Sequence, residues 1–384
     1  VWCGVERCLF GNGKELHFKK LMDFDTIGGK SNKNGARFDL DAMYVNWLGL
    51  SLKCYLPKSE NSLSYVWESL KGKISYCNIK RLMFSSGWRY YAEIVVSGAA
   101  PTRVSIGTST MGIDPGVSTI AGVSEDACVL EELAPNAIQY EKKIQKISQR
   151  MDRSRRISNP NKYNEDGTIN RSNRDPWKYS KNYVKMCRLL KSLYRKKHAY
   201  IVDSHRKLCN KLITIARYFP VEKMHFQALQ KRAKETKRQE KKTEVKQKDG
   251  TVKVIQKYKR KKRFGRSINR RAPARFLLEL KRKAEAVGGV YAEVDTKEFK
   301  ASQYNHVTDT YEKIPLSQRE KEIGKRKVQR DLYSAFLIRN ADLDFKHPDR
   351  EKCEYEFEHF AKMQDQLILK MKESGLSMRQ CFGF

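Results

Sequence analysis

The stretch "MGIDPGVSTIAGV", residues 111–123, decides the fold because it places a carboxylate inside an otherwise apolar strand. Side chains along a strand alternate between its two faces, so Met111 and Ile113 point to one face and Asp114 to the other. Asp114 shares its face with glycines two positions to either side. Small neighbours leave the carboxylate accessible and let the backbone of a bulky polyanion come close. The stretch therefore predicts a buried strand that carries a functional acid.

Two further acids stand in comparable apolar surroundings. Glu222 lies in "PVEKMHF", within a short strand expected over 218–226, and Asp331 lies in "VQRDLYSAFLI", within a helix expected over 326–340. Helical spacing places Asp331 on or beside the buried face of that helix. Its apolar stripe consists of Val328, Leu332, Ala335 and Phe336.

Three such carboxylates cannot all be buried without cations, because an unpaired buried charge is costly. If they converge, their oxygens suit Mg²⁺, and two such ions support phosphodiester cleavage. Each acid also has a local alternative. Asp114 would cap a turn, Glu222 would pair with a lysine, and Asp331 would favour the first turn of its helix.

The charge of the chain indicates a polyanionic partner. Among 384 residues, 78 Lys and Arg face 44 Asp and Glu, which gives a formal net charge of +34. Such an excess favours nucleic acid over an anionic membrane. No apolar run of about 18 residues and no signal-peptide pattern is present, so no membrane partner is expected.

The region 1–108 is predicted to be a small β-barrel. The runs 73–84 and 88–98, joined through "SSG", predict a hairpin, and 48–56 alternates like a further strand. Basic side chains here are candidate nucleic-acid contacts, with an ordinary solvated surface as the alternative. They are Lys19, Lys20, Lys30, Lys33 and Arg37. Trp88, Tyr90 and Tyr91 either stack on bases or divide between core and surface.

The remainder of the chain reads as α/β. Helices are expected over 136–157, 178–216, 272–287 and 352–373, with a strand at 290–295. A basic insertion, residues 231–271, holds 19 Lys and Arg against 4 Asp and Glu. It either contacts phosphates or stays unstructured. Further candidate contacts are Lys257, Arg260, Lys261, Arg263, Arg266 and Arg330.

Nine cysteines without a C-x-x-C pair indicate reduced thiols rather than disulfides or zinc ligands. A zinc site at Cys3 and Cys8 is the alternative. No cysteine lies between 209 and 353, and His306 is expected to be a surface residue. No zinc is therefore predicted.

The three acidic motifs together resemble the RuvC-like branch of the RNase H fold, and the chain resembles the TnpB family of transposon-encoded RNA-guided nucleases. That family is related to type V CRISPR effectors and to Fanzors. "GIDPGVSTIAGV", "VEKMHFQALQKRAK" and "VQRDLYSAFL" resemble its three RuvC motifs. "ERCLFGNGKELHFKK" and "GKSNKNGARF" resemble its oligonucleotide-binding-like wedge barrel.

The resemblance implies an RNase H-like nuclease domain with a mixed sheet, preceded by the wedge barrel. It implies that Asp114, Glu222 and Asp331 hold two Mg²⁺ ions and catalyse cleavage. It also implies a guide RNA from a transposon end and a double-stranded DNA target cut beside a short motif. The expected location is the prokaryotic cytoplasm, at the nucleoid.

The sequence departs from the family pattern in ways that leave alternatives open. The four-cysteine zinc ribbon is missing, and the first wedge strand and the helical recognition insertion are not recognisable. Leu-Tyr-Ser follows Asp331 where relatives often have Asn. The expected parts are a barrel at 1–108, a nuclease domain at 109–345 with a degenerate target-binding loop at 296–326, and a helical tail at 346–384. Alternatives are a non-cutting RNA-guided DNA-binding repressor and a guide-independent RNase H-fold nuclease or transposase.

Overall fold

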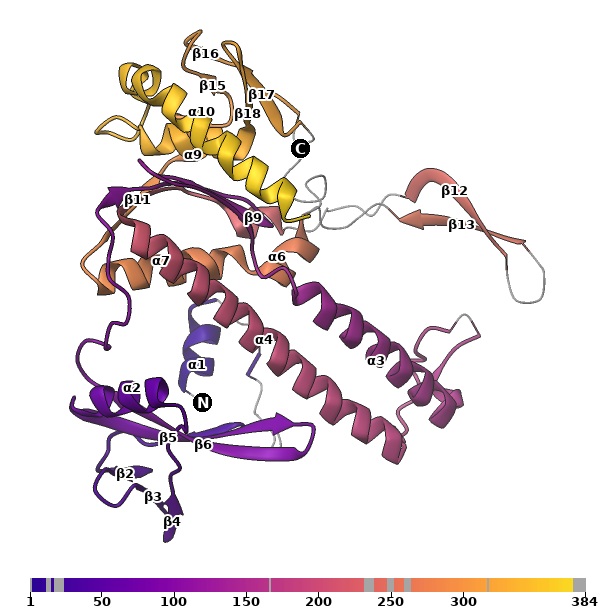
Figure 1. Ribbon diagram of the computed structural model, residues 1–384. Coiled ribbons are helices and arrows are strands. Elements are labelled where there is room, and N and C mark those ends of the chain that lie inside the picture. Colours follow the sequence, from indigo (N-terminus) through magenta and orange to yellow (C-terminus); the bar gives the residue numbers. More distant parts are fainter. Residues whose placement is uncertain are drawn as a thin grey trace. The chain divides into compact units, whose positions relative to one another are not determined.

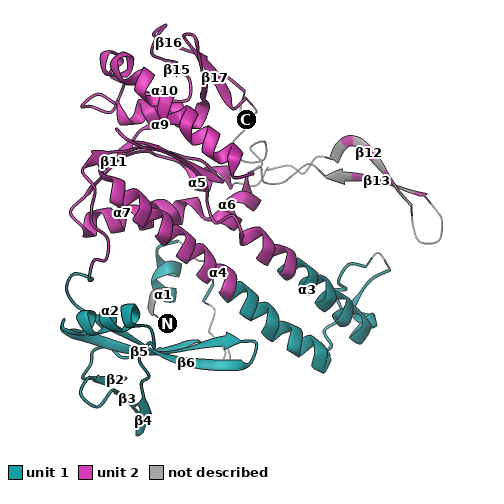
Figure 2. Ribbon diagram, viewed as in Figure 1, with its two compact units in different colours: residues 1–101, 144–195 teal, residues 102–143, 196–384 magenta. Residues whose placement is uncertain are grey.

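The computed structural model describes residues 2–11, 15–16, 24–165, 167–230, 238–246, 252–258, 264–315 and 318–375. The chain divides into two compact units (Figure 2). Unit 1 comprises residues 1–101 and 144–195, and unit 2 comprises residues 102–143 and 196–384. The expected boundary after residue 108 thus falls seven residues later than the observed one, since 108 minus 101 is 7. Sequence reasoning also placed 144–195 in the nuclease domain, whereas its contacts lie with unit 1.

Unit 1 contains two three-stranded antiparallel sheets, with orders β1-β5-β6 and β2-β3-β4 (Figure 1). The predicted hairpin is confirmed, because β5 and β6 pair from Ile74–Val96 to Phe84–Gly87. No ladder among the described strands closes these sheets into a barrel, so the predicted barrel is not confirmed. The elements are α1 (Trp2–Leu9), β1 (Thr26–Gly28), β2 (Arg37–Asp39), β3 (Tyr44–Trp47), β4 (Leu50–Lys53), α2 (Glu60–Leu70), β5 (Ile74–Phe84) and β6 (Gly87–Val96).

Two long helices each belong partly to unit 1 and partly to unit 2. They are α3 (Ala137–Ser158) and α4 (Lys181–Ile215), joined through a short 3-10 helix at Pro160–Lys162. Both lie within three residues of the ranges expected from the sequence. They form because apolar residues recur at helical spacing along otherwise basic stretches.

Unit 2 is built on a mixed sheet with the strand order β10-β9-β8-β11-β14. β8, β9 and β10 are joined by hairpin turns and pair antiparallel, whereas β11 runs parallel to β8 and to β14. The short β7 also pairs with β11. The strands are β7 (Ser109–Thr110), β8 (Gly112–Pro115), β9 (Thr119–Val123), β10 (Cys128–Glu132), β11 (Ala216–Glu222) and β14 (Val290–Val294).

Helices cover both faces of this sheet (Figure 1). One face packs through Ile113 and Phe219 against α4 and α7 (Pro273–Ala286). The other packs through Ala121 and Val123 against α9 (Arg330–Arg339) and α10 (Arg350–Glu373). Because successive side chains of a strand point to opposite faces of the sheet, consecutive residues enter different cores. The expected C-terminal tail is thus a structural part of unit 2, because Phe357 and Phe360 of α10 lie in the core.

The segment expected as a degenerate target-binding loop, 296–326, folds into short elements that pack on α9. Phe299, Tyr304 and Ile323 are buried in the same core as α9. Apolar packing therefore holds this segment in place. The elements are α8 (Thr296–Phe299), β15 (Tyr304–Asn305), β16 (Thr310–Tyr311), β17 (Glu320–Ile323) and β18 (Arg326–Gln329).

His306 corrects one expectation, because it is buried rather than exposed. Its Nδ1 lies 2.8 Å from the Tyr333 hydroxyl, and its ring packs near Phe357. Burial lowers the pKa of His306 to about 4. The residue is a neutral member of the aromatic core around α9. Sequence reasoning missed this because the neighbours of His306 come from the helices α9 and α10, which lie far along the chain.

The basic insertion 231–271 is structured in its described parts. β12 (Arg238–Lys246) and β13 (Val252–Tyr258) form an antiparallel hairpin, and α6 spans Gly265–Arg271. A four-residue helix, α5 (Phe226–Leu229), precedes the insertion. None of the described helices is both long and apolar enough to cross a membrane.

Gly112 determines how closely α9 approaches the sheet. A Cβ atom at this position would lie 2.2 Å from the Ala335 carbonyl oxygen and 2.3 Å from the Arg339 nitrogen, both in the backbone of α9. Such distances are far inside van der Waals contact, and backbone atoms cannot move aside as a flexible side chain does. The sequence predicts that this small residue admits a polyanion, but in the structure the helix α9 occupies the space.

We therefore expect Gly112→Ala to destabilise unit 2 by about 2–3 kcal/mol or more, because α9 must separate from β8. Chemical denaturation followed by circular dichroism measures the loss. Gly122→Ala on β9 is the matched control, since the added Cβ would come closest to the flexible Met111 side chain, 3.1 Å from its sulfur, and would lie at an ordinary contact distance of 3.9 Å from the nearest backbone atom. Equal stability losses for the two variants would contradict this account.

Candidate active site

Two neighbouring parallel strands bring Asp114 and Glu222 together. Ile113 of β8 is in register with Val221 of β11, and both side chains belong to the core on the α4 and α7 side. The next residue on each strand points to the opposite face. Asp114 and Glu222 are therefore neighbours on the face that α9 covers, and their carboxyl groups share a hydrogen bond.

The third acid, Asp331, lies in the first turn of α9. The expected helix over 326–340 begins four residues later than predicted, because 326–329 forms strand β18 instead. Gln329 caps the helix: its side-chain oxygen accepts a 2.6 Å hydrogen bond from the Leu332 nitrogen. Val328 thus belongs to a strand rather than to the helical stripe. This cap and the close contact at Gly112 place the start of α9 next to the two strand acids.

Asp114 and Glu222 both have raised pKa values. Burial raises the pKa of Asp114 well above its usual range, and the negative charges of Glu222 and Asp331 raise it further. Burial likewise raises the pKa of Glu222, with a smaller contribution from Asp331. The positive charge of Arg330 opposes these effects at Asp114 and lowers its pKa. In the metal-free chain the pair is therefore most stable when it shares a proton.

Asp331, in contrast, is neutralised by two arginines. Its Oδ2 accepts a hydrogen bond from Arg319 Nη1 at 3.1 Å, and its Oδ1 accepts one from Arg330 Nη2 at 3.1 Å. Gln329 Nε2 also donates to Oδ2 at 3.3 Å. The expectation that all three acids lack compensation is therefore wrong for Asp331. The site consists of a proton-sharing pair and an arginine-paired aspartate.

The donor set suits a hard divalent cation only in part. Two carboxyl groups held together by a proton are a natural place for a cation to replace that proton. However, no group of three or more His, Cys, Asp or Glu residues is arranged to hold a metal within the described parts of the chain. The carboxylate of Asp331 faces guanidinium groups, so it must exchange partners before it joins a metal site.

The predicted nucleic-acid contacts differ in how exposed they are in the structure. Lys30, Lys33, Arg37 and Arg266 are exposed. Arg330 is instead buried and bound to Asp331, so it is not a surface contact in this state. Outside the described residues lie Lys19, Lys20, Arg260, Lys261 and Arg263, and the side chain of Lys257 is likewise not described.

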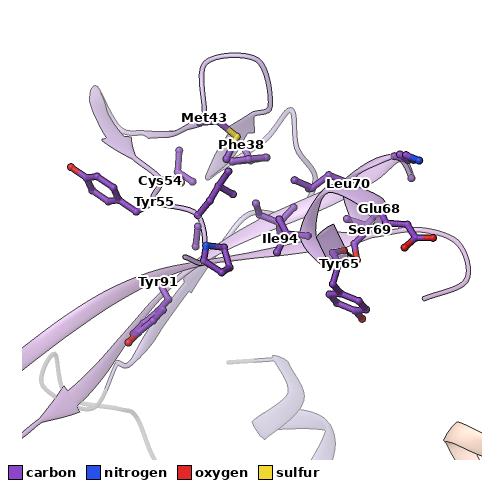
Figure 3. Close-up of a pocket in the computed structure, with 18 of the residues that line it drawn as sticks. Phe38, Met43, Cys54, Tyr55, Tyr65, Glu68, Ser69, Leu70, Tyr91 and Ile94 are labelled. Atoms are coloured by element: carbon purple, nitrogen blue, oxygen red, sulfur yellow. Dashed lines mark hydrogen bonds between the residues drawn. The ribbon is translucent and has the colours of Figure 1, made fainter. Parts of the chain in front are cut away.

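Unit 1 has a hollow of about 1190 Å³ lined by aromatic and aliphatic side chains (Figure 3). Its walls come from β2, α2 and β6, and include Phe38, Tyr65 and Tyr91. Tyr90 and Tyr91 are 67% and 42% exposed, whereas Trp88 packs under the Arg81 guanidinium, 4.4 Å from its ring centroid. The three aromatic residues thus divide between covered and open positions, and the two tyrosines present ring surface at the hollow.

Sequence reasoning missed Arg319, which stands immediately before β17 and holds Asp331. The pair is separated by 12 residues and by the β17–β18 hairpin. An arginine in a segment of unassigned structure carries no periodic signal. The contact between Arg319 and Asp331 could be predicted only from the β17–β18 hairpin, because this hairpin brings the chain back to the start of α9.

No known protein family and no curated protein matches the sequence. Two solved structures of low identity are similar in part. A Cas12f1 complex with sgRNA and target DNA is 12% identical with a TM-score of 0.43, covering 74% of this chain and 48% of that chain. A CRISPR-Cas12f ternary complex is 14% identical with a TM-score of 0.33, covering 82% of this chain and 51% of that chain. The chain spans about half the length of both.

The raised pKa of Asp114 predicts that the metal-free chain loses stability as pH rises. Between the ordinary aspartate value of 3.8 and the raised value, the folded state binds more protons than the unfolded chain. The free energy of unfolding therefore falls with increasing pH across that window. Asp114→Asn removes the titrating group and should flatten this decline.

Urea unfolding in EDTA from about pH 4 to about pH 8 measures the effect. Buried His205 and His306 have lowered pKa values of about 4, so they act with the opposite sign below their ordinary value of 6.5. Both are retained in wild type and variant, and the difference between the two proteins isolates Asp114. Parallel pH profiles for the two proteins would refute the assignment.

Proposed function

We propose that this chain is an RNA-guided, Mg²⁺-dependent DNA endonuclease of the TnpB type. The observation that carries the proposal is the half-buried, hydrogen-bonded pair of Asp114 and Glu222, with the charge of Asp331 close enough to raise both pKa values. A buried acidic cluster is destabilising in a folded chain without a cation or proton to balance it. Such perturbed groups gather at functional sites. The mixed sheet beneath them supports the RNase H-like fold that the sequence motifs imply.

In this proposal Asp114, Glu222 and Asp331 would hold the metal. Two bound Mg²⁺ ions would activate water and stabilise the leaving 3′ oxygen in phosphodiester hydrolysis. The residues of this chain have their own parts. Asp114 and Glu222 give up their shared proton, and β8 and β11 fix their spacing because the two strands are paired. Asp331 adds its carboxylate once it has left its arginine partners.

The proposed partners are a guide RNA and a double-stranded DNA target. The net charge of +34 supports binding to nucleic-acid phosphates. In such a system base pairing reads the sequence, and the protein binds the backbone and a short motif. Lys30, Lys33 and Arg37 of unit 1 are exposed on adjacent turns and strands, where they are available for backbone contacts. We place this activity in the prokaryotic cytoplasm, at the nucleoid, and propose no zinc.

One observation favours a second candidate, an RNA-guided DNA-binding repressor that does not cut. Asp331 is paired with Arg319 and Arg330, so the third acid is neutralised without metal. A non-cutting protein would keep this pairing permanently, whereas a nuclease must break it. A guide-independent nuclease of the RNase H fold is the third possibility, and nothing in the geometry favours it.

Asp114→Ala should abolish Mg²⁺-dependent cleavage, with a loss of at least about a hundredfold, and leave RNA binding intact. Cleavage of guide-matched DNA and RNA retention on the purified protein are measured side by side. Glu293→Gln is the matched control: Glu293 lies in β14 of the same sheet, but it pairs with Lys223 at 3.1 Å on the surface. No cleavage by wild type, with DNA binding preserved, would instead support the repressor.

RNA that copurifies after expression from the native locus should have a constant part from the element and a 3′ part that maps outside it. Base-paired guidance requires such a two-part RNA, because the protein itself binds nucleic acid mainly through backbone charge. Sequencing of the bound RNA measures this. A random sample of cellular RNA, together with cleavage that does not need RNA, would exclude the guided mechanism.

A further inference from the structure

The two arginines that hold Asp331 form a converging pair of guanidinium groups. Arg319 reaches Asp331 from the residue before β17, and Arg330 reaches it from the first position of α9. The backbone ties the two positions together, because the Arg330 nitrogen donates to the Arg319 carbonyl oxygen at 2.8 Å. Both guanidinium groups thus face one small volume that a single anionic group occupies.

The two arginines differ in how firmly they are held. Arg330 is 9% exposed and also donates from Nη1 to the Gln318 carbonyl oxygen at 3.2 Å. Arg319 is 36% exposed, while Asp331 between them is 13% exposed. The buried arginine is fixed in place, and the more exposed one is free to follow a new partner out of the cluster. An anion from solvent would therefore meet Arg319 first.

Carboxylate and phosphodiester groups are interchangeable partners for a guanidinium group. Both present two oxygens to the planar N–H donors of arginine, and both form charge-assisted hydrogen bonds. If Asp331 moves toward a cation near Asp114 and Glu222, Arg330 and Arg319 lose this carboxylate. A buried guanidinium that loses its anion is strongly destabilised unless another anion replaces it. A phosphodiester oxygen meets that requirement.

We propose that Arg319 and Arg330 are a phosphodiester-binding site that Asp331 occupies in the chain without nucleic acid. Phosphate and Asp331 compete for the arginines, and the arginines and the cation compete for Asp331. Phosphate binding therefore releases Asp331 to the cation, and cation binding frees the arginines for phosphate. This coupling is reciprocal, as linkage requires, and deepens the proposed nuclease function on which it rests.

Asp331→Asn tests the phosphate half of the exchange without metal. In EDTA this variant should bind a single-stranded DNA oligonucleotide at least about fivefold more tightly than wild type, because the arginines lose their competing carboxylate. Asp365→Asn removes the same charge from an exposed carboxylate that lies 3.7 Å from Arg326, and controls for net charge. The double variant Asp331→Asn, Arg319→Ala should lose the gain. An equal gain for both single variants overturns the proposal.

Arg319→Ala tests the cation half by Mn²⁺ titration, followed by electron paramagnetic resonance. Without nucleic acid it should tighten Mn²⁺ binding by about fivefold or more, because Asp331 then keeps only one of its two arginine partners and is easier to draw toward the cation. Arg326→Ala on the same hairpin, which removes a pair with Glu358 at 2.8 Å, should not. A merely structural arginine would weaken Mn²⁺ binding when lost, and that result overturns the proposal, as does an unchanged affinity.

The proposed function and this inference fail in distinguishable ways. Mn²⁺ binding that Asp114→Ala does not alter contradicts the metal site and hence the nuclease function. Mn²⁺ binding that needs Asp114 but ignores Arg319 overturns only the exchange. The DNA-binding comparison in EDTA contains no metal, so it decides the phosphate site even if no cleavage is ever observed.

Discussion

Helix α9 lies against strand β8 only because residue 112 has no side chain. The helix backbone occupies the volume that a Cβ would fill, with the Ala335 oxygen 2.2 Å from that position. Every residue described from 332 to 339 is buried, which is unusual for a helix of a water-facing domain and reflects the layers on both sides of it. The approach of α9 brings its first turn, and therefore Asp331, to the ends of β8 and β11. The candidate site depends on this single close contact between backbones.

The acids and arginines of the site come from different elements, and this determines how their charges are balanced. The strands supply Asp114 and Glu222, whose backbone pairing holds them together regardless of their repulsion. The helix and the β17–β18 hairpin supply Asp331 together with its two arginines. One part of the cluster is thus balanced by a proton and the other by guanidinium groups. A change of partner at Asp331 is the step that would join the two parts, and it would link Asp114 and Glu222 to the segment that precedes α9.

The segment 296–326 is held in place by apolar packing around α9. Phe299, Tyr304 and Ile323 enter the core around α9, and Lys321 donates hydrogen bonds to the backbone oxygens of Gln303 and Tyr304. His306 contributes a neutral ring to the same core. Apolar burial is non-directional, so it fixes such a segment through many small contacts instead of one coordination centre. The hairpin that carries Arg319 is therefore anchored close to the site.

The sequence by itself determined which residues of β8 share a face, where the long helices and the β5–β6 hairpin lie, and that the chain carries a large excess of positive charge. These properties follow from periodicity and composition, which are local or additive. Only the tertiary structure decided that Gly112 admits a helix, that His306 is buried and that Asp331 is bound by Arg319. Each of these depends on atoms brought together from distant elements. The alternating pattern of side chains along a strand reveals the face on which each side chain lies. It does not reveal which distant element of the chain packs against that face.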